Sequence, residues 1–242
     1  MSSQASWWSS VGRKYVAAIS GIALILFLIV HLGGNLTMFV SADLFNSYAH
    51  HLEALGPLLY VAEAGLLAIF LFHVFFAVSV RLEQKKARPV DYAVTGSKGG
   101  PSKMTVASKS MLITGIVLII FIPLHIWMFK FNQGSPHPTT ELHGKEVKDL
   151  YAVVESAFQK EAVVGFYSLV MILLGLHLRH GFWSSLQSLG AMNPKWSPVI
   201  YSGGLLFAVL MAGGFLVLPI WLYLAGHCAS SCCGAVVTGG AP

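Results

Sequence analysis

Five long apolar runs dominate the pattern of hydrophobic and polar positions along this chain. They cover residues 16–40, 57–80, 110–130, 162–186 and 198–225. Each run reaches or exceeds the roughly 20 residues with which an α-helix crosses a hydrocarbon core. The runs are longer than barrel strands and do not alternate in polarity, and backbone groups in lipid need internal partners. The pattern therefore predicts an all-α integral membrane protein with five transmembrane helices.

Two of the connections between runs carry apolar residues at helical spacing. In the connection 41–56 these are Phe45, Tyr48, Leu52 and Leu55. We expect a short surface helix there, and a second one over 141–161. The composition agrees with a membrane protein, because only 10% of the 242 residues are charged, against about 25% in soluble domains. We expect one transmembrane domain over 1–225 and a Gly/Ala/Cys tail over 226–242.

Basic residues are distributed unevenly among the connections. Ten lie before the first run, between runs two and three, or between runs four and five: Arg13, Lys14, Arg81, Lys85, Lys86, Arg88, Lys98, Lys103, Lys109 and Lys195. Four lie in the other connections: Lys130, Lys145, Lys148 and Lys160. Because cytoplasmic loops carry the excess of Lys and Arg, we expect a multi-pass protein of the cytoplasmic membrane with its N-terminus inside and its C-terminus outside. The net charge of +5 is then a topology signal and gives no support to nucleic-acid binding. The connection between runs two and three, residues 81–109, is the most basic one. We expect it to contact anionic membrane lipid or a partner subunit.

Five histidines lie within the apolar runs: His31, His73, His125, His177 and His180. An imidazole in hydrocarbon must be paired, hydrated or bound to a metal. Each of the first four runs has a histidine at a similar distance from its start. Because successive helices run in opposite directions, His31 and His125 would share an outer level, and His73 and His177 an inner level.

Two histidines at each level predict two haem sites, one at the outer level and one at the inner level. In an up-down four-helix bundle the first and third helices are diagonal, as are the second and fourth. A porphyrin fits between diagonal imidazoles, with one axial ligand on each face. Two readings compete with this one: hydrogen-bonded core histidines, and a zinc or copper site. Zinc and copper usually recruit carboxylate or thiolate beside imidazole, and Glu63 is the only acid well inside a run.

Two further groups near the end of the fourth run could take part in binding. His180 follows His177 by about one helical turn, so either could be the ligand, and depth favours His177. Arg179 and His180 could hold haem propionates or a quinone carbonyl, or Arg179 could simply reach the interface. The sequence assigns no role to the cysteines of the tail, which are Cys228, Cys232 and Cys233.

Several local sequences resemble a known family. They are FLIVHLGGN (27–35), LFNSYAHHLEALGP (44–57), LFHVFFAV (71–78), FIPLHIWMF (121–129) and GLHLRHGFWSSLQSLG (175–190). Together they resemble the five-helix, two-haem cytochrome b membrane anchor of succinate dehydrogenases and fumarate reductases. The resemblance extends over residues 13–225.

This resemblance implies axial ligation of two haem b groups, by His31 with His125 at the outer site and by His73 with His177 at the inner site. It implies a subunit that does not itself act on succinate. A flavoprotein subunit with FAD and an iron–sulfur subunit would pass electrons through this chain to a quinone, often menaquinone. Two alternatives stay open: a dihaem cytochrome b of another quinone-linked dehydrogenase, and a non-redox transporter that uses the same histidines.

The family also has an acidic residue near the start of its second helix. Glu53 corresponds to it, and the resemblance implies that Glu53 donates or accepts the quinone proton. Glu63 is the second candidate for this role. Neither the direction of the reaction in the cell nor the position of the quinone follows from the sequence.

Overall fold

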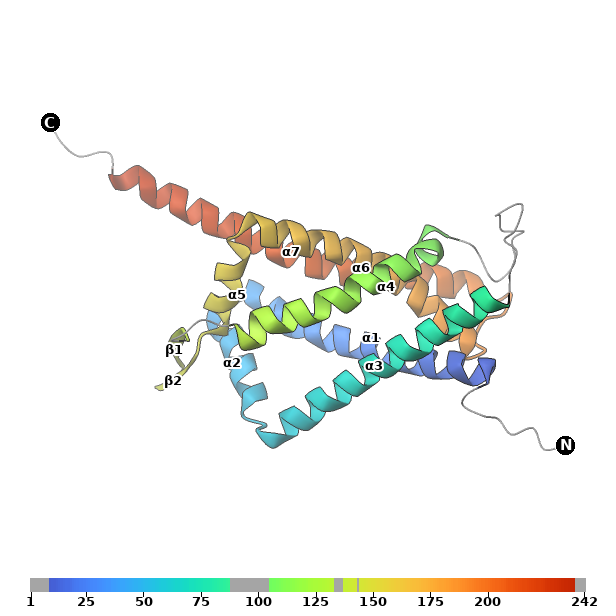
Figure 1. Cartoon of the computed structure of the whole chain (residues 1–242). Helices are drawn as coiled ribbons and strands as arrows, with labels where there is room; N and C mark the ends of the chain where they lie inside the picture. Colours follow the sequence, from blue (N-terminus) through green and yellow to red (C-terminus); the bar gives the residue numbers. More distant parts are fainter. Residues whose placement is uncertain (1–8, 88–104, 133–136, 143, 238–242) are drawn as a thin grey trace. The chain divides into compact units, whose positions relative to one another are not determined.

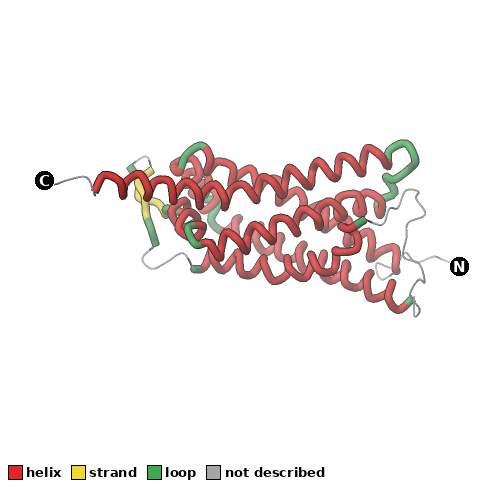
Figure 2. Tube along the Cα trace, turned by 90° about the horizontal axis from the view of Figure 1, so that it is seen from above, coloured by secondary structure: helices red, strands yellow, loops and turns green. Residues whose placement is uncertain are grey.

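The computed structural model describes residues 9–87, 105–132, 137–142 and 144–237, with side chains up to 228. The basic residues Arg88, Lys98 and Lys103 and the side chains of Cys232 and Cys233 lie outside this part. The helices are α1 (Ser10–Leu36), α2 (Ala42–Glu53), α3 (Pro57–Lys86), α4 (Val106–Ile126), α5 (Leu150–Phe158), α6 (Glu161–Ser188) and α7 (Ser197–Val237). A 3-10 turn, η1 (Thr37–Phe39), extends α1, and a π-helical turn, η2 (Trp127–Phe131), extends α4. Helix dominates the described chain (Figures 1 and 2), which confirms the predicted all-α class.

Five of the described helical stretches are long and apolar enough to cross a membrane. They are Ser10–Phe39, Pro57–Lys86, Val106–Phe131, Glu161–Ser188 and Ser197–Cys228. Only 6% of the most apolar window of the second stretch is buried, so most of its apolar side chains face outward. Lipid is the medium in which such a surface is stable, and large exposed apolar areas are rare on soluble monomers. The chain is therefore a multi-pass membrane protein, whereas the orientation of its termini stays a prediction.

The helices extend beyond the apolar runs into their polar flanks. Helix α1 begins at Ser10, not near Val16, because the Ser9 hydroxyl caps it by accepting a hydrogen bond from the Gly12 N–H at 3.0 Å. Helix α7 continues to Val237, past the expected domain boundary. The similar distance of the histidines from the starts of their runs is therefore a property of the apolar runs and does not hold for the helices.

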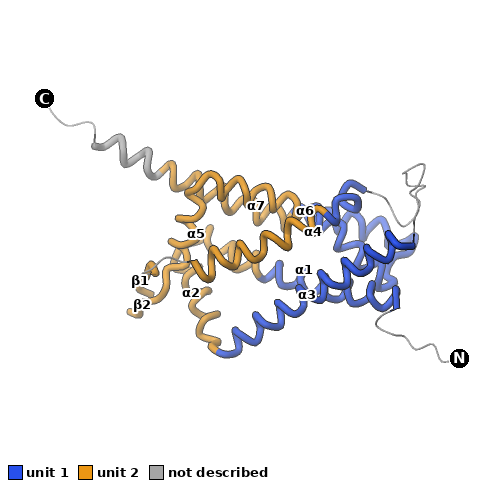
Figure 3. Tube along the Cα trace, in the orientation of Figure 1, with its two compact units in different colours: residues 1–30, 57–112, 176–209 blue, residues 31–56, 113–175, 210–242 orange. Residues whose placement is uncertain are grey.

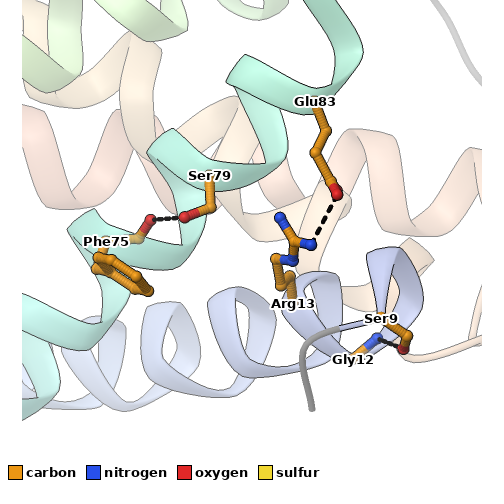
Figure 4. A network of polar contacts seen from close by, with 6 residues as sticks. All are labelled: Ser9, Gly12, Arg13, Phe75, Ser79 and Glu83. Atoms are coloured by element: carbon orange, nitrogen blue, oxygen red, sulfur yellow. Dashed lines mark hydrogen bonds and ion pairs between the residues drawn. The ribbon is translucent and has the colours of Figure 1, made fainter. Parts of the chain in front are cut away.

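An ion pair links the beginning of α1 to the end of α3 (Figure 4). The Arg13 guanidinium lies 2.7 Å from a carboxylate oxygen of Glu83. Both side chains are partly exposed, so the pair adds little free energy of folding. Its value to the fold is that it joins the ends of two neighbouring helices.

The contacts within the chain define two compact units (Figure 3). Unit 1 consists of Met1–Val30, Pro57–Leu112 and Leu176–Val209, and unit 2 of His31–Gly56, Ile113–Gly175 and Leu210–Pro242. Helices α1, α4, α6 and α7 each contribute to both units. His73 and His177 belong to unit 1, and His31 and His125 belong to unit 2.

In unit 2, α2 packs against α5 and against a small hairpin. The hairpin consists of β1 (Thr139–Leu142) and β2 (Lys145–Lys148), antiparallel, with Thr139 opposite Lys148 and Leu142 opposite Lys145. The helix expected over 41–56 is present as α2. The helix expected over 141–161 is wrong in its first part, because these residues belong to the hairpin. Gly144, at φ 76°, permits the turn between its strands.

Candidate haem-binding histidines

In unit 2, His31 of α1 and His125 of α4 lie next to each other. Their ring centroids are 5.9 Å apart and the rings are nearly perpendicular, at 86°. A metal–imidazole bond is about 2 Å long, so two rings that ligate one metal ion from opposite sides have centroids roughly 6 Å apart. The observed spacing therefore fits a pair of axial ligands. The contact joins the first and third spans; that the two histidines hold one haem stays a prediction.

Aromatic side chains surround His125. The Phe121 ring stacks on it with centroids 5.5 Å apart, and Phe129 meets it edge-on at 5.3 Å. The Nδ1 atom of His125 lies 3.2 Å from the Tyr167 hydroxyl oxygen. Apart from this hydroxyl and the His31 imidazole, the side chains named here are apolar, which suits a ligand to a haem.

His31 has a different environment from that of its partner. The Asn35 side-chain amide donates a hydrogen bond to the His31 carbonyl oxygen at 2.7 Å, and the same nitrogen lies 3.5 Å from His31 Nε2. The Phe215 ring of α7 packs beside the imidazole with centroids 5.7 Å apart. Helices α1 and α7 thus both contribute to the position of this ring.

In unit 1, the neighbours of His73 determine which of its nitrogens carries the proton. Nδ1 lies 3.1 Å from the Ala17 carbonyl oxygen. A carbonyl oxygen only accepts hydrogen bonds, so Nδ1 must be the protonated nitrogen. In the neutral imidazole this leaves the lone pair of Nε2 free for a metal. A backbone carbonyl that orients the far nitrogen of a ligating histidine is a common arrangement in metal sites.

Small residues of α1 allow the close approach of His73. A Cβ atom placed on Gly21 would lie 3.1 Å from His73 Cε1 and 3.4 Å from His73 Nδ1. Ser20 is also buried beside this ring, with its hydroxyl 3.4 Å from Nδ1. The small pair Ser20–Gly21 therefore accommodates the imidazole against the backbone of α1.

His177 lies on α6, in the same unit as His73 and about one helical turn before His180. The pairing of His73 with His177 stays a prediction, and both residues belong to unit 1. His180 packs edge-on against Trp183, with centroids 4.6 Å apart. Its Nδ1 atom is buried and has no hydrogen-bond partner among the described residues. That atom is the kind of polar group that a bound carboxylate or carbonyl would satisfy.

The two pairs supply imidazole ligands only. Within the described part of the chain, no three His, Cys, Asp or Glu side chains come together in a group that could hold a metal ion. Two protein ligands are the number that an iron already bound by four porphyrin nitrogens requires. The donor set therefore fits haem better than it fits zinc or copper.

The two acidic candidates lie in different surroundings. Glu53, at the end of α2 in unit 2, is exposed, and its carboxylate forms an ion pair with Lys148 at 3.1 Å. Glu63 is half-buried on α3, in unit 1. Arg179 is half-buried on α6, between His177 and His180.

One comparison with known proteins gives a match. The chain is 24% identical over 174 residues to the succinate dehydrogenase cytochrome b558 subunit of Bacillus subtilis (strain 168). The match covers 71% of this chain and 76% of the relative. No family model matches the chain, and no solved structure does.

The chain resembles the cytochrome b subunit of succinate dehydrogenase. This match confirms the resemblance found in the sequence motifs.

Two features of this cytochrome b-like chain were not foreseen from its sequence. Tyr167 and Met128 form contacts around His125, and a π-helical turn follows that histidine. A tyrosine inside an apolar span, and Pro123 two residues before the histidine, are the signals that could have directed attention to them.

Proposed function

We propose that this chain is the dihaem cytochrome b membrane anchor of a succinate:quinone oxidoreductase. It would carry electrons between an iron–sulfur subunit and a membrane quinone, with menaquinone as the expected species. The flavoprotein subunit, which holds FAD, would carry out the chemistry on succinate or fumarate. The observation that carries this proposal is the approach of His31 and His125 to 5.9 Å between ring centroids, in a chain similar to the succinate dehydrogenase cytochrome b558 subunit of Bacillus subtilis.

The histidines would act as axial ligands, His31 with His125 and His73 with His177. Haem b bound by two imidazoles supplies reversible one-electron transfer. The protein's part is to hold the imidazoles, to fix their tautomers and to exclude water. At His73 the Ala17 carbonyl fixes the proton on Nδ1. At His125 the Tyr167 hydroxyl lies at the corresponding atom.

We infer that polar groups outside the pairs serve the propionates and the quinone. His180, with its buried Nδ1, and Arg179 would hold a propionate or a quinone carbonyl in unit 1. Glu53 would exchange the quinone proton, with Glu63 as the second candidate. Because Glu53 is paired with Lys148, it would have to leave this ion pair, or share it with the quinone, when a proton is transferred.

The decisive experiment is purification of the intact complex from membranes through a tag on this chain. We expect an iron–sulfur protein and a flavoprotein to co-purify, together with succinate-dependent reduction of a quinone. A complex that oxidises a different substrate would point to another quinone-linked dehydrogenase. A chain that purifies alone and without haem would favour the transporter alternative.

A further inference from the structure

We propose that Tyr167 is a positioning residue for His125, and that its hydroxyl tunes the reduction potential of the haem held by the His31–His125 pair. This inference rests on the proposed function. It concerns a residue that lies outside the predicted ligand set. It follows from three features of unit 2: a hydrogen bond, a packed aromatic cluster and a change in the backbone of α4.

The direction of the hydrogen bond follows from the nitrogen of His125 that binds the iron under the proposed function. Tyr167 Oη lies 3.2 Å from His125 Nδ1, and the same hydroxyl donates its proton to Met128 Sδ at 3.9 Å. When Nε2 of His125 binds the iron, the proton of the neutral imidazole is on Nδ1. The Tyr167 oxygen then accepts this N–H, and the contact with the Met128 sulfur gives the tyrosine proton a weak acceptor.

Aromatic packing holds the Tyr167 ring in place. The ring is 5% exposed. It meets Phe158 of α5 at 5.0 Å and Phe121 of α4 at 5.1 Å between centroids, in both cases nearly edge-on. Edge-to-face pairs of this kind favour one orientation of each ring. The hydroxyl that lies next to His125 therefore belongs to a rigid side chain. A group that orients a metal-binding histidine through a hydrogen bond needs such rigidity.

The backbone of α4 lacks one regular hydrogen-bond donor before His125 and changes its helix type after it. Pro123 cannot donate the usual backbone hydrogen bond. After Ile126 the helix changes to the π-helical turn η2, where the Asn132 N–H reaches the Trp127 carbonyl at 2.8 Å. Met128, the acceptor for the tyrosine hydroxyl, lies in this turn. Single π-helical turns inside helices are frequent at functional sites.

The two units differ in the group that accepts a hydrogen bond from Nδ1 of the histidine. At His73 it is a backbone carbonyl, that of Ala17, which no side-chain substitution removes. At His125 it is a side chain. A hydrogen bond accepted from Nδ1–H makes the imidazole a stronger electron donor and so favours the ferric iron. Loss of the tyrosine hydroxyl should therefore raise the reduction potential at this pair and leave the other pair unchanged.

The test is potentiometric titration of the haem absorption in the purified complex with Tyr167→Phe. Phenylalanine keeps the ring and its packing and removes only the hydroxyl. We expect both haems to be retained, and one of them to shift about tenfold toward its reduced form, which equals about 59 mV for one electron. Tyr15→Phe, at a 40% exposed position of α1, is the matched control and should leave both potentials unchanged. Met128→Leu, which removes the acceptor of the tyrosine proton, should shift the same haem.

Four outcomes separate this inference from the proposed function. A shift confined to one haem, in Tyr167→Phe and not in Tyr15→Phe, supports it. Two haems with unchanged potentials in Tyr167→Phe overturn the positioning role and leave the proposed function intact. A shift of both haems by the same amount also overturns it, because a general packing change would then be the cause. An unaltered complex that contains no haem overturns the proposed function itself.

Discussion

At the scale of single residues, the two best-defined histidines differ in what holds their Nδ1 proton. His73 uses the carbonyl of Ala17, and His125 uses the hydroxyl of Tyr167. Both arrangements leave Nε2 as the nitrogen that can bind a metal. The histidines could be predicted as candidate ligands from the sequence, because an imidazole inside an apolar run is unusual. The hydrogen-bond partners Ala17 and Tyr167 could not be predicted from it, because every residue has a carbonyl group and aromatic residues are common in membrane spans.

Gly21 tests how tightly His73 is held. In Gly21→Ala the new Cβ would lie 3.1 Å from His73 Cε1, which forces the ring to move and weakens its bond to Ala17. Overpacking of this size costs about 1 kcal/mol or more, so we expect a several-fold loss of haem from the His73–His177 pair in the purified complex. Gly65→Ala is the control, since a Cβ there meets no atom within 4 Å. Equal haem content in the two variants would contradict the geometry described for His73.

At the scale of elements, the connections between spans are joined by a buried asparagine. Asn46 of α2 is 2% exposed, donates to the Asp149 carboxylate at 2.8 Å, and accepts from the Tyr151 N–H at 2.9 Å. Asp149 in turn caps α5 by accepting from the Ala152 N–H at 3.0 Å. This contact joins segments that are distant in sequence, and for that reason the hydrophobic pattern could not predict it.

Replacement of Asn46 should loosen the packing of α2 on α5. In Asn46→Ala the Asp149 carboxylate loses a hydrogen bond and the Tyr151 N–H is left without its acceptor. We expect a loss of about 2 kcal/mol in stability, the usual effect of leaving a buried polar group without its partner. Thermal unfolding of the detergent-solubilised protein measures this loss. Ser47→Ala, at the next position of α2, should change stability by less than about 0.5 kcal/mol; a similar loss in both variants would show that Asn46 has no special role.

The positions of the spans were predicted from the sequence, whereas the ends of the helices were not. The apolar runs located all five spans, because lipid tolerates few polar residues over such a length. They did not locate the helix ends, since Ser9 caps α1 well before its apolar run begins. They also missed the hairpin of β1 and β2, whose four-residue strands are too short to stand out from a helical pattern.

At the scale of the whole molecule, the histidines within the spans are the residues proposed to bind haem. Helix α3 contributes only to unit 1, whereas α1, α4, α6 and α7 contribute to both units. Each unit contains one of the predicted pairs, and each predicted pair joins residues from different spans. The pairing of alternate spans was predicted from the position of each histidine in its run, from the alternating direction of the spans and from the diagonal arrangement of an up-down four-helix bundle. The quinone site is not defined at this scale, because it depends on local polar groups around the pairs.

Under the proposed function each histidine pair holds one haem b. The most direct measurement is the haem b content per chain of the purified complex, before and after substitution of one histidine in each pair. We predict two haems in the unaltered complex, and one in His73→Ala and in His125→Ala, with a different spectral component lost in each. His51→Ala, at an exposed position of α2, should keep both. Retention of both haems in either pair variant, or loss of the same component from the two, would contradict the account.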